Sequence, residues 1–312
     1  MKGRVYIGTS GFTYKSWNAH FYPPELPQRL QLEYFATQFP TVEINATFYR
    51  LPTLAMTRGW VKRTPKSFVY ALKGSRFITH MKKLANLDEP VKRPRYPNAK
   101  IARGNGLDIY FDRIKPMEAR TGVILWQLPP MLQIDLPRLD DFLEQLKPYG
   151  YRHALEFRHA SWYGDKTFDL LRKHKVAHVA LSTLSMPQIR IATADVVYIR
   201  FHGLEGGFAH DYTRAELEPW AKFCREQAAA GRRVYAYFNN DVNVLAPQNA
   251  KMLMQMAGEF TVEPEDQEIP TRPRRSSCVP RKSQKISGSR RKSRGKAVAG
   301  GGEMKGTLEL LD

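Results

Sequence analysis

Cysteine is nearly absent: the 312 residues contain two, Cys224 and Cys278, and no C-x-x-C pair. This excludes a disulfide framework and argues against a cysteine-based metal site. We expect Cys224 to be a small buried side chain on a helix. No apolar run approaches the roughly 20 residues that span a membrane, and no secretory signal precedes the first predicted strand. The composition therefore predicts a cytoplasmic protein that has no membrane partner.

Acidic residues are missing from 270–300, which carries eleven Lys and Arg. From Pro264 onward apolar periodicity stops, and Arg, Lys, Ser, Pro and Gly dominate. Such a segment buries too little apolar surface to offset the entropy lost on ordering. We therefore predict a folded domain over 1–263 and a disordered basic tail over 264–312. The last residues, 306–312, include three leucines that could dock on a protein partner.

The formal net charge is +19, and the tail does not account for all of it. A basic folded domain attracts polyanions such as nucleic acid, phosphorylated small molecules or an acidic membrane surface. The alternative is a basic surface that serves only solubility.

Short apolar strands alternate with one-faced helical patterns along the rest of the chain. Helical spacing begins at Leu32, Leu107, Leu139, Leu217 and Ala250, as is typical of helices that pack on a sheet. The eight expected strands are 4–7, 41–44, 68–72, 122–125, 154–157, 178–181, 197–201 and 234–238. This order predicts an α/β protein with a TIM-like (β/α)8 barrel. A doubly wound open sheet is the alternative, but no G-x-G-x-x-G follows the first strand.

Several of these strands end in charged or amide side chains, which an apolar buried strand has no ordinary reason to carry. A barrel brings all the carboxyl ends of its strands around one site. We therefore expect a polar cluster at that mouth. Its candidate members are Glu43, Asn45, Lys73, His80, Gln127, Glu156, Arg158, Arg200, His202, Asn239, Asn240 and Asp241.

The candidate catalytic residues are Glu43, Glu156 and His202. A pair of carboxylates at the strand ends suits general acid and base work, and an imidazole suits either role. The alternative for the carboxylates is structural: Glu43 could pair with Arg50, and Glu156 with Arg158.

The other members are expected to bind substrate. Arg158 and Arg200 suit bidentate recognition of phosphate or carboxylate, unless they only close ion pairs to the glutamates. Lys73 could bind phosphate, or act as a nucleophile if it is desolvated. The remaining expected substrate-binding residues are Asn45, His80, Gln127, Asn239, Asn240 and Asp241.

The sequence indicates no certain cofactor, but a divalent metal ion is a further possibility. Glu43, Glu156, His202 and Asp241 could hold one as a Lewis acid. No short-spaced ligand motif such as H-E-x-x-H supports this, and the nearby Arg and Lys side chains could stabilise an anion instead.

The order of several sequence blocks resembles the domain of unknown function 72 family, also called YecE-like. The blocks are 7–11, Trp17 with 21–23, 41–45 with 47–50, Lys73, 79–80, 127–130, 156–158 with Trp162, 200–203, and 238–241. The resemblance covers about residues 4–260 and not the basic tail. Phe12 stands where the family usually has Trp, and Asn18-Ala19 replaces a polar residue followed by Gly. The resemblance implies a TIM-like barrel but no reaction, because the family's activity is unassigned.

The sequence thus favours an enzyme that acts on a phosphate-bearing substrate at the barrel mouth, including hydrolysis of nucleic acid phosphodiesters. One alternative is a nucleic-acid-binding protein without catalytic activity. Another is a sugar or sugar-phosphate isomerase. Binding to nucleic acid that weakens steeply with salt would separate the first two from the third.

Overall fold

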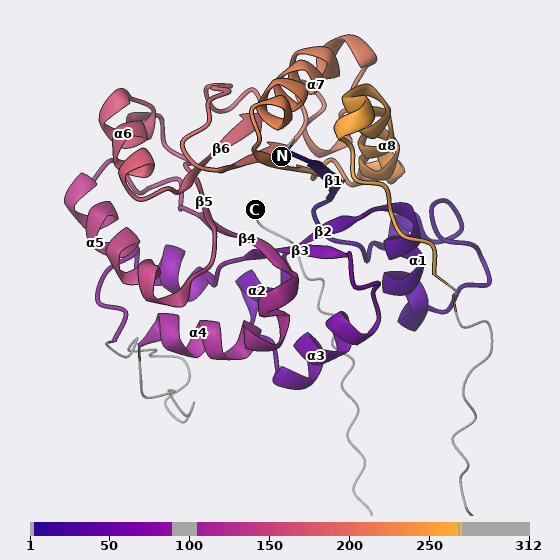
Figure 1. Ribbon diagram of the computed structural model, residues 1–312, viewed down its shortest axis with the longest axis horizontal. Coiled ribbons are helices and arrows are strands. Elements are labelled where there is room, and N and C mark those ends of the chain that lie inside the picture. The colour runs from indigo at the N-terminus through magenta and orange to yellow at the C-terminus, as the bar shows by residue number, and fades with distance from the viewer. Residues whose placement is uncertain (1–2, 89–104, 268, 270–312) are drawn as a thin grey trace, which may run out of the picture. The chain divides into compact units, whose positions relative to one another are not determined.

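Eight parallel strands form a barrel that is surrounded by helices (Figure 1). The computed structural model describes residues 3–88, 105–267 and 269. Around the barrel each strand pairs with its neighbours in the order β1-β8-β7-β6-β5-β4-β3-β2. The strands are β1 (Val5–Thr9), β2 (Thr41–Ile44), β3 (Val69–Lys73), β4 (Thr121–Gln127), β5 (His153–Glu156), β6 (Ala177–Ser182), β7 (Val196–Phe201) and β8 (Arg233–Phe238). The predicted TIM-like barrel is confirmed.

The ends of the sheet, β1 and β2, meet just beyond β1. Ser10 forms a parallel bridge with Glu43, and the backbone N–H of Gly11 donates to the carbonyl oxygen of Glu43 at 2.8 Å. On the other side, the N–H of Ser10 donates to the carbonyl of Phe238 at 2.8 Å. Ser10 therefore links the first, second and last strands at the carboxyl end of the barrel.

The helices are α1 (Gln31–Gln38), α2 (Ala46–Tyr49), α3 (Leu54–Lys62), α4 (Gly106–Ile114), α5 (Leu136–Leu146), α6 (Asp165–Lys173), α7 (Arg214–Ala229) and α8 (Leu245–Ala257). Single turns of 3-10 helix occur at 15–17, 28–30, 147–149, 160–162, 207–209, 242–244 and 258–260, with a longer one at 115–120 and a π-helix at 77–81. Residues 183–195, between β6 and β7, contain no helix. This one connection therefore departs from the expected alternation of strands with helices.

The helical spacing that begins at Leu217 lies in α7, and the helix opens with a capping box. Thr213 accepts from the N–H of Glu216 at 3.2 Å, while Glu216 accepts from the N–H of Thr213 at 2.7 Å, so the capping box is present. Cys224 lies fully buried on the inner face of this helix. This face packs on the strands with the other apolar helix faces and forms the larger hydrophobic core.

A second, smaller core fills the inside of the barrel. It contains Ala71, Leu125, Ala154, Tyr198 and Tyr237 among others. Side chains along a strand alternate between the two faces of the sheet. The residues two positions further along these strands therefore also point inward, at the carboxyl end.

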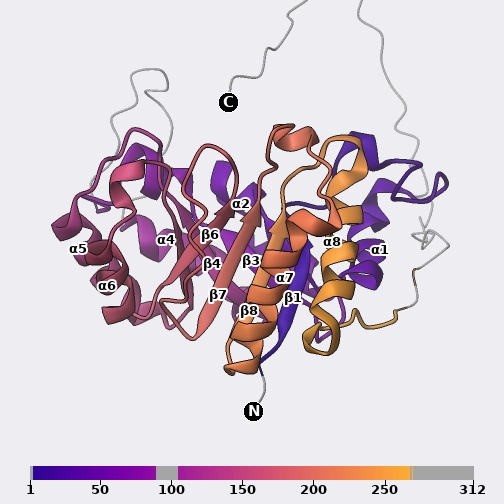
Figure 2. The same ribbon diagram turned by 90° about the horizontal axis from the view of Figure 1, so that it is seen from above.

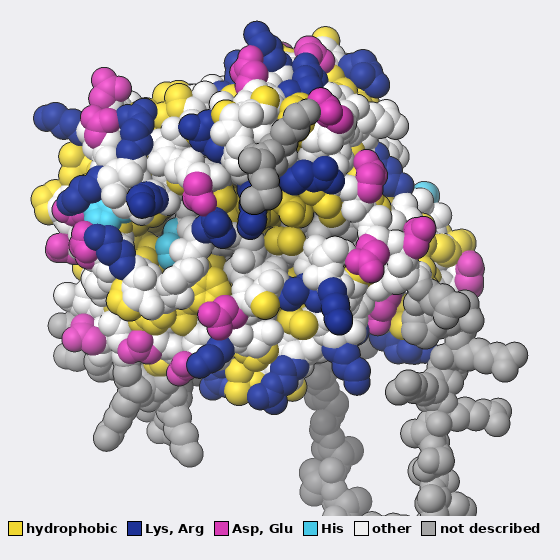
Figure 3. All heavy atoms as spheres, viewed as in Figure 1, with side chains coloured by type: hydrophobic (Ala, Val, Ile, Leu, Met, Phe, Trp, Pro, Cys, Tyr) yellow, Lys and Arg dark blue, Asp and Glu magenta, His cyan; other side chains and the backbone are white. Residues whose placement is uncertain are grey.

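Figure 2 shows the barrel from the side, with the N-terminus at the end where the strands begin. Figure 3 shows the face on which the N-terminus lies, where Lys and Arg side chains are scattered among Asp and Glu. No helix in the described part of the chain is long and apolar enough to cross a membrane.

The described residues of the predicted tail are 264–267 and 269. Two of them bond to the barrel domain: Glu265 accepts from Ser67, and Gln267 donates to the carbonyl of Glu33. The rest of the predicted tail, 268 and 270–312, lies outside the described residues.

Candidate functional site

Alternation along the strands directs most of the predicted polar side chains into the barrel mouth. Glu43 shares its face of β2 with Thr41, and Lys73 shares its face of β3 with Ala71. Likewise Glu156 follows Ala154, and Arg200 follows Tyr198. Ala71, Ala154 and Tyr198 belong to the inner core. The charged residues that follow them on the same face therefore form the next layer, at the carboxyl end of the barrel.

Arg200 joins the two candidate catalytic glutamates. Its Nη2 donates to Glu43 Oε1 at 2.8 Å, and its Nη1 donates to Glu156 Oε2 at 2.5 Å. The Arg200 side chain is 1% exposed, and both glutamate side chains are fully buried. Nη2 also donates to Ser10 Oγ at 3.2 Å. The guanidinium is therefore the centre of the cluster.

Glu43 is held as a carboxylate. Ser10 and Arg200 donate to Oε1, and the hydroxyl of Tyr198 donates to Oε2 at 2.6 Å. Burial alone would raise the pKa of Glu43, but Arg200, Lys73 and the two hydroxyl groups outweigh it and hold the pKa below its ordinary value. Glu43 is consequently ionised at neutral pH and can accept a proton but has none to donate.

Glu156 is in a similar state. Gln127 donates to its Oε1 at 2.7 Å. Arg158 donates to the same oxygen, and Arg200 donates to Oε2. Burial opposes the charge, but Arg158 and Arg200 hold the pKa of Glu156 well below its usual range. The structure therefore realises the ion-pair alternative for Glu156, which pairs with both arginines. Glu43 pairs with Arg200 and not with Arg50.

His202 lies beside this cluster as a neutral ring. Arg158 Nη2 is 3.1 Å and Arg200 Nη1 3.2 Å from its Nε2. A guanidinium can only donate, so Nε2 is the acceptor in both of these contacts. The other ring nitrogen, Nδ1, lies 3.2 Å from Asn239 Nδ2. Burial and the positive charge of Arg200 lower the pKa of His202 to about 4.

Lys73 is the member of the cluster that no acceptor holds. It is 7% exposed, and its Nζ lies 4.3 Å from the centroid of the Phe48 ring. Within the described residues, Nζ makes no hydrogen bond or ion pair with the protein. Burial and Arg200 lower the pKa of Lys73 to about 8, although Glu156 and Glu43 act in the opposite direction.

Two further predicted residues, Asn45 and His80, lie at the same mouth. Asn45 donates to Ser10 Oγ at 2.9 Å, and its amide oxygen is buried without a hydrogen-bond partner. His80 is half-buried, with Nδ1 2.8 Å from the hydroxyl of Thr79 and its ring edge against Phe48. Burial and Lys73 lower the pKa of His80 to about 4.

Asn240 lies apart from the cluster, unlike Asn239. Its amide donates to the carbonyl of His210 at 2.8 Å and to Asn249 Oδ1 at 2.7 Å. Asn240 shares its face of the strand with Phe238, which belongs to the outer core. Its hydrogen bonds therefore hold the loops after β7 and β8 together.

Asp241 lies at the edge of the mouth, in the loop after β8. Its carbonyl accepts from the indole N–H of Trp17 at 3.2 Å, and its half-buried carboxyl acts electrostatically on Tyr14. Burial raises the pKa of Asp241. Among the predicted carboxyl groups, Asp241 is thus the one whose pKa is raised and not lowered.

Sequence reasoning did not select Tyr198 and gave Ser10 no role, although both contact Glu43 directly. The signal for Tyr198 is its position two residues before Arg200, which gives both side chains the same inward face of β7. Ser10 follows β1 directly, whereas each of the charged residues Glu43, Lys73, Glu156 and Arg200 is one of the last two residues of its strand.

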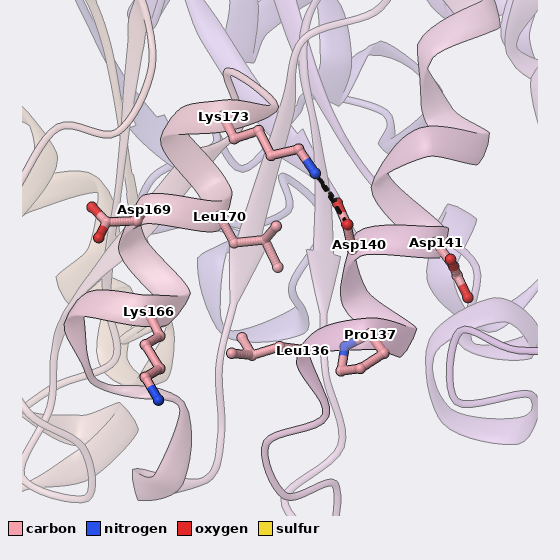
Figure 4. Close-up of a pocket in the computed structure, with 8 residues that line it drawn as sticks. All are labelled: Leu136, Pro137, Asp140, Asp141, Lys166, Asp169, Leu170 and Lys173. Carbon is pink, nitrogen blue, oxygen red and sulfur yellow. Dashed lines mark hydrogen bonds and ion pairs between the residues drawn. The ribbon is translucent and has the colours of Figure 1, made fainter.

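The described residues do not gather Glu43, Glu156, His202 and Asp241 into a metal-ligand group. The guanidinium of Arg200 lies between the two carboxylates, and together with Arg158 it balances their charge. The ligand-type group that the described chain does contain is Asp140, Glu144 and His174, on α5 and just after α6. Asp140 is already paired with Lys173 at 3.0 Å, as Figure 4 shows beside the hollow between these helices. Glu144 is paired with Lys147 at 2.6 Å.

Comparison with known proteins identifies the family. The model of the family described as "Protein of unknown function DUF72" matches residues 6–274. The chain belongs to the DUF72 family.

Relatives and solved structures of this family agree with the match. The UPF0759 protein YunF of Bacillus subtilis is 25% identical over 285 residues, which cover 81% of this chain and 94% of YunF. A crystal structure of a DUF72 protein from Thermotoga maritima has a TM-score of 0.69 at 27% identity, and covers 82% of this chain and 100% of its own. A DUF72 protein from Enterococcus faecalis has a TM-score of 0.68 at 16% identity, over 85% of this chain and 99% of its own.

Proposed function

We propose that this DUF72 protein is an enzyme that acts on a small phosphate-bearing substrate at the carboxyl mouth of its barrel. The observation that carries the proposal is the amine of Lys73. It lies beside two buried ion pairs, yet no acceptor in the described protein binds it. A largely buried amine that has no acceptor in the described protein loses most of its hydration without a protein hydrogen bond in return, which favours a role in binding or chemistry.

The charges around Lys73 favour an anionic ligand. Glu43 and Glu156 are matched by Arg200 and Arg158 through hydrogen-bonded pairs. Lys73, which is largely protonated at neutral pH, adds a positive charge that no ion pair offsets. The side chain of Arg158 is 26% exposed, so this guanidinium can contact a ligand from the mouth. A phosphate group suits such a set, because it accepts from a guanidinium fork and an ammonium at the same time.

The proposed roles follow from the state of each group. Arg158 and Lys73 bind the phosphate, and Arg200 with its two carboxylates holds the strands that carry them. The orienting residues are Asn45, which retains a free amide oxygen, and Asn239. Asp241 is the proposed proton donor, because burial raises its pKa while both glutamates are fixed as anions.

The test is ligand binding by the Lys73→Met variant. Inorganic phosphate, sugar phosphates and nucleoside monophosphates are titrated against the wild type by calorimetry. We expect at least one phosphate compound to bind, and Lys73→Met to weaken its binding by tenfold or more. The variant should melt no lower than the wild type, because the buried amine costs stability. Lys222→Met, on the exposed face of α7, is the matched control.

Failure of every phosphate compound to bind the wild type would overturn the proposal. Hydrolysis of nucleic acid phosphodiesters is the finer form of the same proposal, and it requires that a short DNA or RNA strand binds and is cleaved. Binding without cleavage would favour the nucleic-acid-binding alternative. Interconversion of a sugar phosphate would favour the isomerase alternative.

A further inference from the structure

Lys73 occupies a position that suits covalent chemistry as well as binding. It is the last residue of β3, and it follows Ala71 on the face that lines the barrel interior. Its Nζ lies over the aromatic face of Phe48 at 4.3 Å from the ring centroid. The amine is thus held at the base of the mouth by an apolar surface, while its lone pair or its protons remain available to a ligand.

The surroundings of this amine oppose its protonation. Burial is the largest effect, and the positive charge of Arg200 adds to it, so the pKa of Lys73 falls to about 8. An ordinary lysine has a pKa of about 10.4, so Lys73 has a neutral fraction on the order of a hundredfold larger at pH 7. A neutral amine is the nucleophilic form, whereas a lysine that only binds phosphate acts best as an ammonium.

We propose that Lys73 is a nucleophile that forms an imine with the carbonyl carbon of a phosphate-bearing aldehyde or ketone. The phosphate part of this statement rests on the proposed function. The imine itself rests on the position and the environment of Lys73.

The reaction is balanced without any other reactant. The nitrogen lone pair of Lys73 attacks the carbonyl carbon, and the carbon–oxygen double bond opens to a carbinolamine. The carbon–oxygen single bond then breaks, and the oxygen leaves as water with the two protons that the amine carried. No atom is oxidised or reduced. When the imine takes up a proton it regains the positive charge of the original ammonium, which Glu156 and Glu43 favour by their negative charges. The phosphate of the substrate is attracted by the same charge.

The experiment traps the imine in the wild-type protein. Full-length protein is incubated at pH 7 with glycolaldehyde phosphate and sodium cyanoborohydride, which reduces an imine to a stable secondary amine. Peptide mass spectrometry then measures the rate of modification at each lysine. We expect Lys73 to be modified more than ten times faster than Lys222, which is exposed on α7. Modification of Lys73 at the rate of Lys222, or slower, would overturn the proposal.

Two comparisons separate the imine from the proposed function. Preferential trapping of Lys73 by unphosphorylated glycolaldehyde, as fast as by its phosphate, would support the imine and count against the phosphate. Binding of non-carbonyl phosphate esters, with no preferential trapping at Lys73, would support the proposed function and overturn the imine.

Variants confirm the site of modification. Lys73→Arg keeps the positive charge but cannot form the imine, so the fast adduct should disappear. Lys222→Arg should retain it. The decisive measurement is made on the wild type, so it does not depend on whether the Lys73 variant folds.

Discussion

The hydroxyl of Tyr198 donates to Glu43 Oε2 at 2.6 Å, and this bond crosses the inside of the barrel. Tyr198 lies on β7 and Glu43 on β2, with β8 and β1 between them in the strand order. Both side chains are fully buried. The contact therefore joins strands that share no backbone hydrogen bonds, and it connects the aromatic layer of the interior to the charged layer above it.

The Tyr198→Phe variant tests this connection. It leaves a buried carboxylate oxygen without its donor, and a hydrogen bond to a charged group contributes about 1.5–3 kcal/mol. We expect the midpoint of thermal unfolding to fall by about 3–10 °C. Tyr6→Phe is the control, since the Tyr6 ring stacks on Tyr235 at 5.1 Å and its hydroxyl contributes no bond to the site. An equal fall of the unfolding midpoint in both variants would mean that the hydrogen bond to Glu43 contributes no more to stability than the Tyr6 hydroxyl does.

The sequence predicts the barrel well because the alternation of apolar strands with one-faced helices is repeated along the chain. Each expected strand is found, with bounds that differ by at most two residues. The capping box at Thr213 and Glu216 depends only on neighbouring residues, so it too could be read directly. Residues 183–195, between β6 and β7, form no helix. The helical spacings found in the sequence include none there, so only the general alternation of strands and helices predicted one.

The candidate site was predictable in its members and only partly in their pairing, since Glu156 with Arg158 could be foreseen but Arg200 with both glutamates could not. A charged side chain at the end of an apolar strand is the signal that identifies Glu43, Glu156 and Arg200 in the sequence. Which carboxylate faces which guanidinium depends on how strands distant in sequence are set around the barrel, and no local pattern records this. Asn240 illustrates the limit. The rule that strand ends carry site residues includes it, whereas the alternation along β8 directs it outward to Asn249.

The pH dependence of stability should reflect the neutral state of His202. Its folded pKa of about 4 lies below the unfolded value of about 6.5. Between these values the unfolded chain binds more protons than the folded one, so stability rises with pH from about 4 to 6.5 and falls on acidification. One such group contributes at most about 1.4 kcal/mol per pH unit.

Chemical denaturation between pH 5 and pH 7 measures this slope. We expect His202→Gln to show a shallower slope than the wild type. His80 and His178 have similarly lowered pKa values, so part of the slope should remain. An unchanged slope would show that His202 is already protonated in the folded protein at pH 5.

The basic segment after the barrel is expected to add affinity for polyanions without adding specificity. Truncation after Pro270 tests this, because it removes all eleven basic residues of 271–300 and keeps the contacts that Glu265 and Gln267 make with the barrel domain. Fluorescence anisotropy with a DNA duplex at two salt concentrations gives affinity and salt dependence. We expect both to decrease on truncation, since each neutralised phosphate contributes to the salt slope. Equal values for the two chains would assign the segment another role, such as binding a protein partner.

The Glu156→Gln variant distinguishes a structural cluster from a catalytic one. Gln keeps the size and one acceptor oxygen but removes the charge that Arg158 and Arg200 both contact. Breaking a buried ion pair from one side costs about 3–5 kcal/mol. Because one acceptor remains, we expect a loss of about 2–4 kcal/mol, seen as a midpoint lower by about 5–10 °C.

The control is Glu144→Gln on the exposed side of α5, whose pair with Lys147 is open to solvent and should contribute little to stability. Glu156 is fully buried and its pKa is depressed, so its contribution is present above the unfolded pKa of about 4.3 and is lost as the pH falls below it. The difference between wild type and Glu156→Gln should therefore shrink when melting is repeated at pH 3.5. A variant that is as stable as the wild type at pH 7 would show that the fold does not need this carboxylate. Glu156 would then be kept for the reaction, because functional sites retain residues that do not stabilise the fold.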